Sequence, residues 1–290
     1  MNLGQILAMP GRDGPDTDPR FLAARAILAV HIAARCWQFA VLGSPFFGSI
    51  SALVATAAAA ICLAGFRPGA TDRGHRAIQL SAAVVALQIL GTFPLVANHV
   101  FLELYCAAAF ALFDPKRDRV VVLEGLRWMA LLVFFWGGVQ KALYGTWFSA
   151  ELLAIGIVQK ESFARFFVFL ADPEEVARLT AYGPPSPGDG PYRLSGPIAW
   201  VGNLVWMAEI GLPLLLLHDR TRIVGALGML GLLVAIQLGA LEFFFGGLYA
   251  SLLLLFLPGA WNRRLLWPFV GFYLLLTASV VGLLPSWGFN

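Results

Sequence analysis

Charged residues are scarce in this chain of 290 residues: they make up 13% of it, whereas hydrophobic residues make up 59%. A soluble domain carries about 25% charged residues, so the composition excludes an ordinary soluble protein. It predicts the all-α class, as a polytopic integral membrane bundle of helices that lies in the lipid bilayer. The formal net charge of +3 is small, and nothing in it indicates a nucleic-acid partner.

Cysteine is also rare, and its spacing excludes two kinds of site. Cys36, Cys62 and Cys106 lie in apolar segments and show no CxxC spacing. They indicate neither a disulfide framework nor a metal site, and we expect small buried side chains. Residues 1–20 lack the basic start and long apolar run of a signal peptide. We expect this segment to be a flexible cytoplasmic tail.

Long apolar windows predict about nine membrane spans, because about twenty apolar residues suffice to cross a bilayer. The fourth and eighth windows are short, so we expect them to be tilted, re-entrant or fused with a neighbour. Together the spans predict a single transmembrane helical domain over residues 21–285. They lie near residues 21–42, 48–66, 78–96, 99–113, 121–145, 196–217, 223–241, 246–258 and 266–284.

Arginine and lysine gather in alternate connections between these windows. The positive-inside rule places such connections in the cytoplasm. The N-terminus is then cytoplasmic, and the C-terminus lies on the extracytoplasmic side. The basic connections read RPGATDRGHR, DPKRDR, HDRTR and WNRR.

The outer connection at residues 146–195 differs from the others in length and polarity. Its first half mixes apolar residues with Glu151, Lys160, Glu161 and Arg165, which predicts an extracytoplasmic helix lying in the membrane interface. Its second half, AYGPPSPGDGPYRLSGP, predicts an irregular loop. Such a loop could cover an outward-facing cavity or serve as a plain connector.

Lysine is the scarcest basic residue, and one lysine is unusually placed. Seventeen of the twenty basic residues are arginines, and Lys141 lies within the apolar stretch LLVFFWGGVQKALYGTW. Burial disfavours a charged ammonium, and a neutral lysine can act as a base, which arginine cannot. The alternative is a side chain that snorkels to the nearby membrane surface.

Other polar residues are expected on the same outer side as Lys141. Asn98 and His99 fall at the predicted turn before the fourth span, and Glu242 falls at the turn before the eighth. Gln237 lies about one helical turn inward of Glu242. These positions indicate a shared outward-facing cavity, because ionisable groups inside spans are functional candidates.

Glu103 and Arg127 are two further ionisable residues within the predicted spans. Glu103 lies one helical turn from His99 on the same face, where it could set the tautomer of that ring. Arg127 is close to the inner surface and could serve a structural role there.

The blocks around Lys141 and His99 resemble the vitamin K-dependent gamma-carboxylase family, whose bacterial members are often described as horizontally transferred transmembrane domain proteins. The family has an Asn-His pair before a helix, then Leu-Arg, about ten apolar residues, Gly-Val-x-Lys and a Trp. A looser second stretch has an acidic residue in a helix, a short Arg turn and an aromatic Gly motif. Here these residues read Asn98-His99, Leu126-Arg127, Gly138-Val139-Gln140-Lys141, Trp147, Glu209, RTRIVG and EFFFGGLYASLLL.

The resemblance implies a lyase or oxidoreductase chemistry on an isoprenoid quinone. In the family the lysine is thought to deprotonate vitamin K hydroquinone, which then takes up molecular oxygen and ends as an epoxide. The strong base formed on the way removes a gamma proton from a glutamate, which takes up carbon dioxide. Carried over, Lys141 would be the base toward a menaquinol-like hydroquinone. His99 with Asn98 would orient a substrate oxygen. The protein would lie in a bacterial inner membrane, with its site on the extracytoplasmic side. From the resemblance and the predicted outer cavity together, we expect the substrate-binding residues to be Asn98, Glu103, Arg127, Trp147, Glu209, Gln237 and Glu242.

Two departures from the family pattern leave the final substrate open. Gln237 stands where the family often has a His, and an amide cannot relay a proton. The given chain also has no counterpart of the large lumenal region with which the animal enzyme presents its glutamate. Carboxylation would therefore need a separate substrate or partner protein. The alternatives are a non-catalytic quinone-binding assembly factor and a small-molecule transporter.

Overall fold

The computed structural model is helical throughout the part of the chain that it describes. The predicted all-α class is confirmed, since no strand occurs within these residues. The predicted tail lies outside the described residues apart from its last three positions. The described residues are 18–43, 45–65, 71–94, 98–145, 147–167, 169–181, 192, 194 and 196–285.

Within the described residues, five helices are long and apolar enough to cross a membrane, which makes the chain a helical membrane protein. They are α2 (Pro19–Leu42), α3 (Pro45–Ala64), α6 (Arg119–Tyr144), α10 (Pro197–Leu216) and α11 (Arg222–Ala240). All nine predicted windows overlap helices, but the number of spans stays a prediction. The other four windows fall on α4 (Thr71–Thr92), α5 (Asn98–Leu112), α12 (Phe243–Leu253) with the 3₁₀ turn η1 (Leu254–Phe256), and α13 (Gly259–Val280).

The helices at these other four windows, α4, α5, α12 and α13, do not meet this length and hydropathy criterion, for two different reasons. Helices α5 and α12 are only 15 and 11 residues long, which is short for a bilayer core of about 30 Å. Helices α4 and α13 are long enough but begin with charged residues, among them Arg73, Arg76, Arg263 and Arg264.

The chain forms two compact units, and their boundaries fall inside α6 and α12. The first unit comprises residues 1–129 and 247–289, and the second comprises residues 130–246. Each unit is described by itself below.

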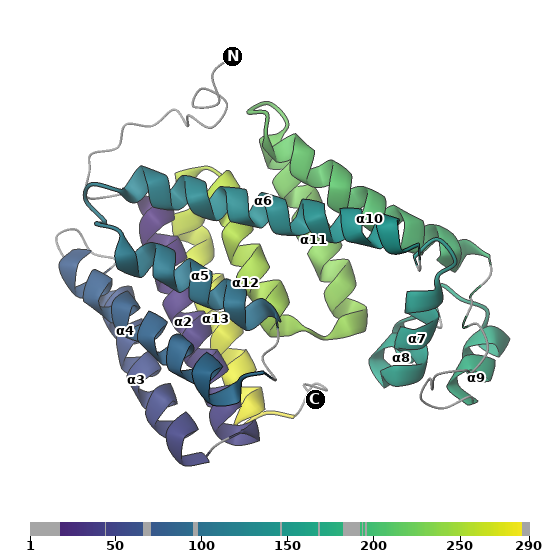
Figure 1. Cartoon of the computed structure of the whole chain (residues 1–290), viewed down its shortest axis with the longest axis horizontal. Helices are drawn as coiled ribbons and strands as arrows, with labels where there is room; N and C mark the ends of the chain where they lie inside the picture. Colours follow the sequence, from purple (N-terminus) through teal and green to yellow (C-terminus); the bar gives the residue numbers. More distant parts are fainter. Residues whose placement is uncertain are drawn as a thin grey trace. The chain divides into compact units, whose positions relative to one another are not determined.

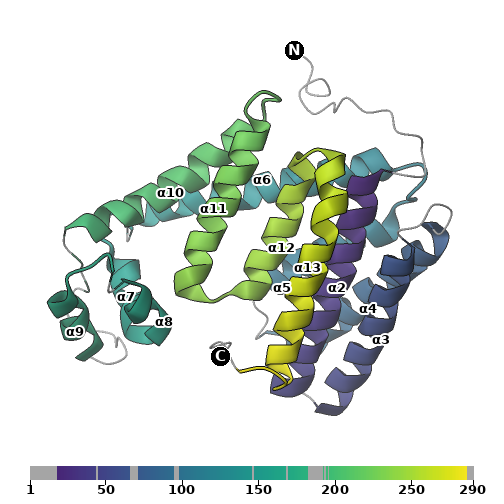
Figure 2. The same cartoon turned by 180° about the vertical axis from the view of Figure 1, so that it is seen from behind.

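Helix α2 is the centre of the first unit. Asp18 caps its N-terminus by accepting from the Arg20 backbone N–H at 2.9 Å, and Pro19 occupies the first helical turn. Its many alanines let neighbouring helices approach closely; a Cβ at Gly48 of α3 would lie 2.5 Å from the Ala40 Cα. Figures 1 and 2 both show α2 beside α3 and α13, and it also contacts α4 and α5.

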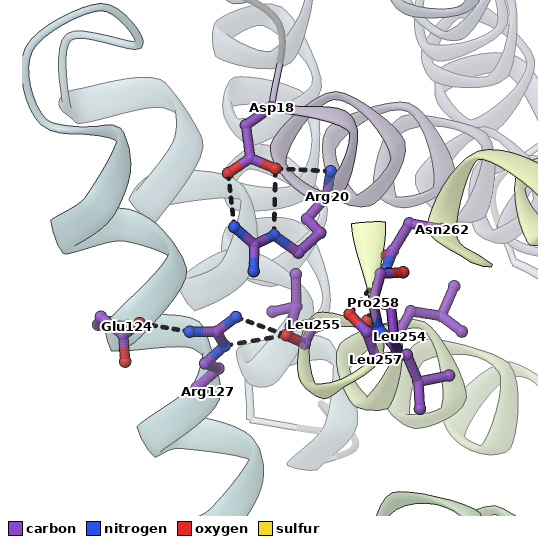
Figure 3. A network of polar contacts seen from close by, with 9 residues as sticks. All are labelled: Asp18, Arg20, Glu124, Arg127, Leu254, Leu255, Leu257, Pro258 and Asn262. Carbon is purple, nitrogen blue, oxygen red and sulfur yellow. Dashed lines mark hydrogen bonds and ion pairs between the residues drawn. The ribbon is translucent and has the colours of Figure 1, made fainter. Parts of the chain in front are cut away.

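Two buried side chains of the first unit hold the turn that ends α12. Arg127 donates from Nε and Nη2 to the Leu255 carbonyl, at 2.9 and 2.7 Å, and it also pairs with Glu124. Asn262 is fully buried and its amide donates to three carbonyls of the same turn (Figure 3). These are the carbonyls of Leu254, Leu257 and Pro258. Helix ends leave carbonyls without intrahelical donors, and here side chains supply the donors.

The second unit contains the end of α6, the α10–α11 pair and three short helices. Gly225 and Gly228 lie where α11 packs closely on α10, because a Cβ at either would come within 2.9 Å of a leucine side chain. The short helices are α7 (Glu151–Gln159), α8 (Glu161–Phe167) and α9 (Pro173–Ala181). They share an apolar core that includes Leu153, Ile157 and Leu179.

The predicted interfacial helix after residue 146 is therefore two helices instead of one. Lys160 separates α7 from α8 because its backbone is extended, with φ −129° and ψ 116°. The mixed polarity of this segment predicted helical structure, but it did not predict the separation into two helices at Lys160. Most of the predicted Pro/Gly loop, residues 182–191, lies outside the described residues.

Candidate functional site

The candidate site of the second unit begins with a close approach of two helices. Gly138 of α6 faces α10 so closely that a Cβ there would lie 2.8 Å from Ile210 Cγ1. It would also lie 2.9 Å from Glu209 Cβ and from the Trp206 carbonyl oxygen. Only glycine fits at this contact without movement. Lys141 follows three residues later, so it lies on the same face of α6 as Gly138.

The close approach brings Lys141 into contact with Glu209. The Lys141 ammonium donates to both carboxylate oxygens of Glu209, with an Nζ–Oε2 distance of 2.5 Å. The carboxylate side chain is 6% exposed, whereas the lysine side chain is 25% exposed. The lysine side chain is therefore the more exposed member of the pair.

An aromatic ring covers a further side of the amine. Lys141 Nζ lies 4.8 Å from the centre of the Trp147 ring, which is a cation–π distance. Helix α10 holds this turn of the chain in place: a Cβ at Gly202 would lie 2.9 Å from the Trp147 carbonyl oxygen. The neighbouring Phe148 ring packs edge-on against Trp206, with centroids 5.6 Å apart.

These contacts change the interpretation of two predicted residues. The Lys141 side chain does not extend to the membrane surface on its own, because its ammonium pairs with a buried carboxylate on another helix. Glu209 was expected among the substrate-binding residues, yet its carboxylate is engaged by Lys141. Sequence spacing could not reveal this pair, since the two residues are 68 positions apart.

Gln237 and Glu242 lie around the end of α11 in the same unit. Both polar atoms of the Gln237 side chain are buried and have no hydrogen-bond partner among the described residues. A Cβ at Gly246 would lie 2.7 Å from that amide, so glycine makes room for it. Glu242 pairs with Lys160 at 3.4 Å, and both side chains are about half exposed.

The first unit has a separate buried polar cluster around Glu103. Its Oε1 lies 3.0 Å from His31 Nε2 and 3.2 Å from Arg35 Nε. On the other side of His31, Nδ1 lies 2.9 Å from the Tyr273 hydroxyl. Tyr273 carries no local sequence signal of this contact, because it lies on α13, 242 positions from His31 of α2.

The predicted role of Glu103 beside His99 is only part of what the structure shows. His99 is half-buried near the start of α5 and contributes to the electrostatic surroundings of Glu103. The Glu103 carboxylate also contacts His31 and Arg35 of α2. Asn98 begins α5, and its side chain lies outside the described residues.

The predicted residues are thus distributed over both units. His99, Glu103 and Arg127 belong to the first, and Lys141, Trp147, Glu209, Gln237 and Glu242 belong to the second. A cavity shared by His99 and Lys141 stays a prediction. Arg127 contacts the Leu255 carbonyl and Glu124, which gives it a structural role, while a substrate contact by Arg127 also stays a prediction.

No group of three or more His, Cys, Asp or Glu side chains suited to a metal ion occurs among the described residues. Comparison of the chain with protein-family models, curated proteins and solved structures gave no significant match.

Proposed function

We propose that the chain is an intramembrane enzyme in which Lys141 is the base that deprotonates a hydroquinone. The observation that carries this proposal is the partly exposed Lys141 side chain, whose amine contacts the buried Glu209 carboxylate and the Trp147 ring. A lysine and a carboxylate at this distance form an acid–base pair that can exchange protons with a bound hydroxyl. Such a pair at the crossing of two apolar helices suits a substrate that enters from the lipid.

The chemistry proposed for the pair comes from the resemblance to the gamma-carboxylase family. A hydroquinone hydroxyl is a phenol, so its proton affinity resembles that of tyrosine, with a pKa of about 10 in water. Its planar ring also matches the aromatic ring of Trp147, which is partly buried beside the amine. Oxidation by molecular oxygen would leave one oxygen atom in an epoxide and release the other as water.

The remaining parts of the proposal concern location and the final acceptor. The isoprenoid tail of a menaquinol-like substrate partitions into the bilayer, and a buried site keeps water away from reactive species. We place the site on the extracytoplasmic side of a bacterial inner membrane, as the distribution of basic loops indicates. Uptake of carbon dioxide would require a substrate glutamate from a separate protein.

Oxygen consumption by the protein in lipid nanodiscs tests the proposal. With reduced menaquinone-4 added, the wild-type chain should consume oxygen and form the epoxide. Lys141→Ala should lower the rate on the order of 100-fold or more, which is the usual contribution of a general base. Lys141→Arg should also fail, because the guanidinium stays protonated.

Lys160→Ala is the matched control, since Lys160 also pairs with a glutamate in the second unit but is about half exposed. It should retain the wild-type rate. Full activity of Lys141→Ala would exclude Lys141 as the base. Quinone that copurifies with a wild-type protein inactive under oxygen would favour the non-catalytic assembly factor instead.

A further inference from the structure

We infer that Glu209 is the internal acceptor for the proton that Lys141 takes from its substrate. This inference rests on the proposed function, and it assigns a positioning role to a residue that acts through Lys141. It answers a difficulty in that proposal: an amine already paired with a carboxylate holds a full complement of protons. Such an ammonium can act as a base only if one of its protons has somewhere to go.

The geometry gives that proton one short path. Both oxygens of Glu209 contact Lys141 Nζ, and the glutamate side chain is almost wholly buried, whereas the lysine side chain is partly exposed. A substrate hydroxyl can therefore reach the amine more readily than the carboxylate. Proton transfer along a hydrogen bond of 2.5 Å needs little movement of either side chain.

The surroundings of Glu209 also permit it to become neutral. Glu209 is largely buried, and its carboxylate pairs with Lys141. Glu103 is different, because His31 and Arg35 both lie within 3.2 Å of its carboxylate. A carboxylate held by several cations resists protonation, whereas one held by a single exchangeable ammonium does not.

The proposed step conserves protons and charge. The substrate hydroxyl transfers its proton to Lys141 Nζ while one N–H proton of Lys141 moves to a Glu209 oxygen. The O–H bond of the substrate breaks, an O–H bond forms on Glu209, and Lys141 remains an ammonium. The substrate gains one negative charge and the Lys141–Glu209 pair gains one positive charge. No electron is transferred in this step.

Infrared difference spectroscopy tests the step without turnover. Reduced menadione is added to the wild-type protein in nanodiscs under argon, and absorbance reports formation of the hydroquinone anion. We expect the anion to appear together with the C=O band of a protonated carboxylic acid. That band should shift in D₂O and disappear in Glu209→Gln. Glu161→Gln is the matched control, because it alters an exposed pair with Arg165 in the same unit, and it should keep the band.

The outcomes separate this inference from the proposed function. Anion formation without a carboxylic acid band, or with a band that persists in Glu209→Gln, overturns the role of Glu209 and leaves Lys141 as the base. Absence of the anion in the wild type overturns both.

Turnover provides a second measurement that a merely structural role would not reproduce. Glu209→Gln should lower kcat on the order of 100-fold near pH 7, with partial recovery at high pH, where hydroxide removes the proton from Lys141. Glu209→Asp keeps a carboxylate and should retain more activity than Glu209→Gln. A pH profile of Glu209→Gln parallel to that of the wild type would overturn the inference. Equal loss in both variants at every pH would do the same.

Discussion

His31 and Glu103 lie on different helices of the first unit, yet His31 Nε2 and Glu103 Oε1 are 3.0 Å apart and both side chains are almost wholly buried. A carboxylate can only accept, so Nε2 of His31 faces Glu103 with a proton. On the other side of the ring, Nδ1 lies 2.9 Å from the Tyr273 hydroxyl. This chain of contacts joins α2, α5 and α13.

Breaking the cluster at either end should destabilise the first unit to different degrees. Tyr273→Phe removes the hydroxyl that hydrogen-bonds to His31 Nδ1 and should cost about 1–3 kcal/mol. Glu103→Gln removes the buried negative charge that His31 and Arg35 contact and should cost about 3 kcal/mol or more. Thermal unfolding in nanodiscs measures both changes. Tyr105→Phe is the control, because Tyr105 lies on the same helix as Glu103 but is exposed; a Tyr273→Phe protein as stable as this control would contradict the prediction.

Adding one methyl group at Gly138 should separate Lys141 from Glu209. Gly138→Ala would place a Cβ within 3 Å of α10 backbone and side-chain atoms, and such overpacking costs about 1–3 kcal/mol. We expect a lower unfolding temperature and a large loss of quinol oxidation. Gly137→Ala should have neither effect, because its Cβ would meet only Glu209 Oε2, at 3.8 Å. Equal behaviour of the two variants would show that the helix contact is looser than described.

Removal of Arg127 should weaken the turn at the end of α12. Arg127→Ala leaves the buried Leu255 carbonyl without its two donors, at a cost of about 1–3 kcal/mol. Arg127→Lys should recover only part of this loss, since lysine lacks the fork of donors. Chemical unfolding of the two variants measures the difference. Arg117→Ala, which removes an exposed side chain, should leave the stability within about 0.5 kcal/mol of the wild type.

Asp18 should make the stability of the first unit depend on pH in the acid range. Burial raises the pKa of this carboxyl, but hydrogen bonds and charge from Arg20 outweigh burial, so its pKa is lowered overall. A lowered folded pKa stabilises the protein above the pKa of the unfolded chain, about 3.9 for Asp. This stabilisation is lost as the pH falls through the folded pKa.

The matching experiment compares Asp18→Asn with the wild type from pH 7 to pH 2. The variant should unfold at a lower temperature near neutrality, and the gap should close in acid, where both proteins carry a neutral side chain. A gap that stays constant over this range would mean that Asp18 acts through its hydrogen bonds alone.

The positions of the helices followed closely from the sequence, whereas their number of membrane crossings did not. Apolar windows located all nine helices of the predicted spans, because burial in lipid demands long apolar runs. The windows could not show that α4 begins in a charged stretch or that α12 gives way to a 3₁₀ turn at Leu254. The end of α12 depends on hydrogen bonds from Arg127, which is 128 positions away from Leu255, and from the nearby Asn262.

The sequence indicated which residues belong to the candidate site, but it did not indicate which of them contact one another. The scarcity of lysine and the cost of burying its charge marked Lys141, and the same argument marked Glu103 and Glu209. Which carboxylate serves which cation depends on helix packing. Because Gly138 has no side chain, α10 packs close to α6 and Glu209 contacts Lys141. His31 and Arg35 lie on α2, and the packing of α2 places them against Glu103.

By itself, the sequence determined that this protein is a helical membrane protein. It also determined which of the few ionisable residues lie in apolar segments, where burial of their charge has a high free-energy cost. Both properties are local, since they depend on the composition of short windows and on the solvation of single side chains. Only the tertiary structure decided the partners of those residues. Lys141 and Glu209 are 68 positions apart, and they meet because two helices cross where one residue has no side chain.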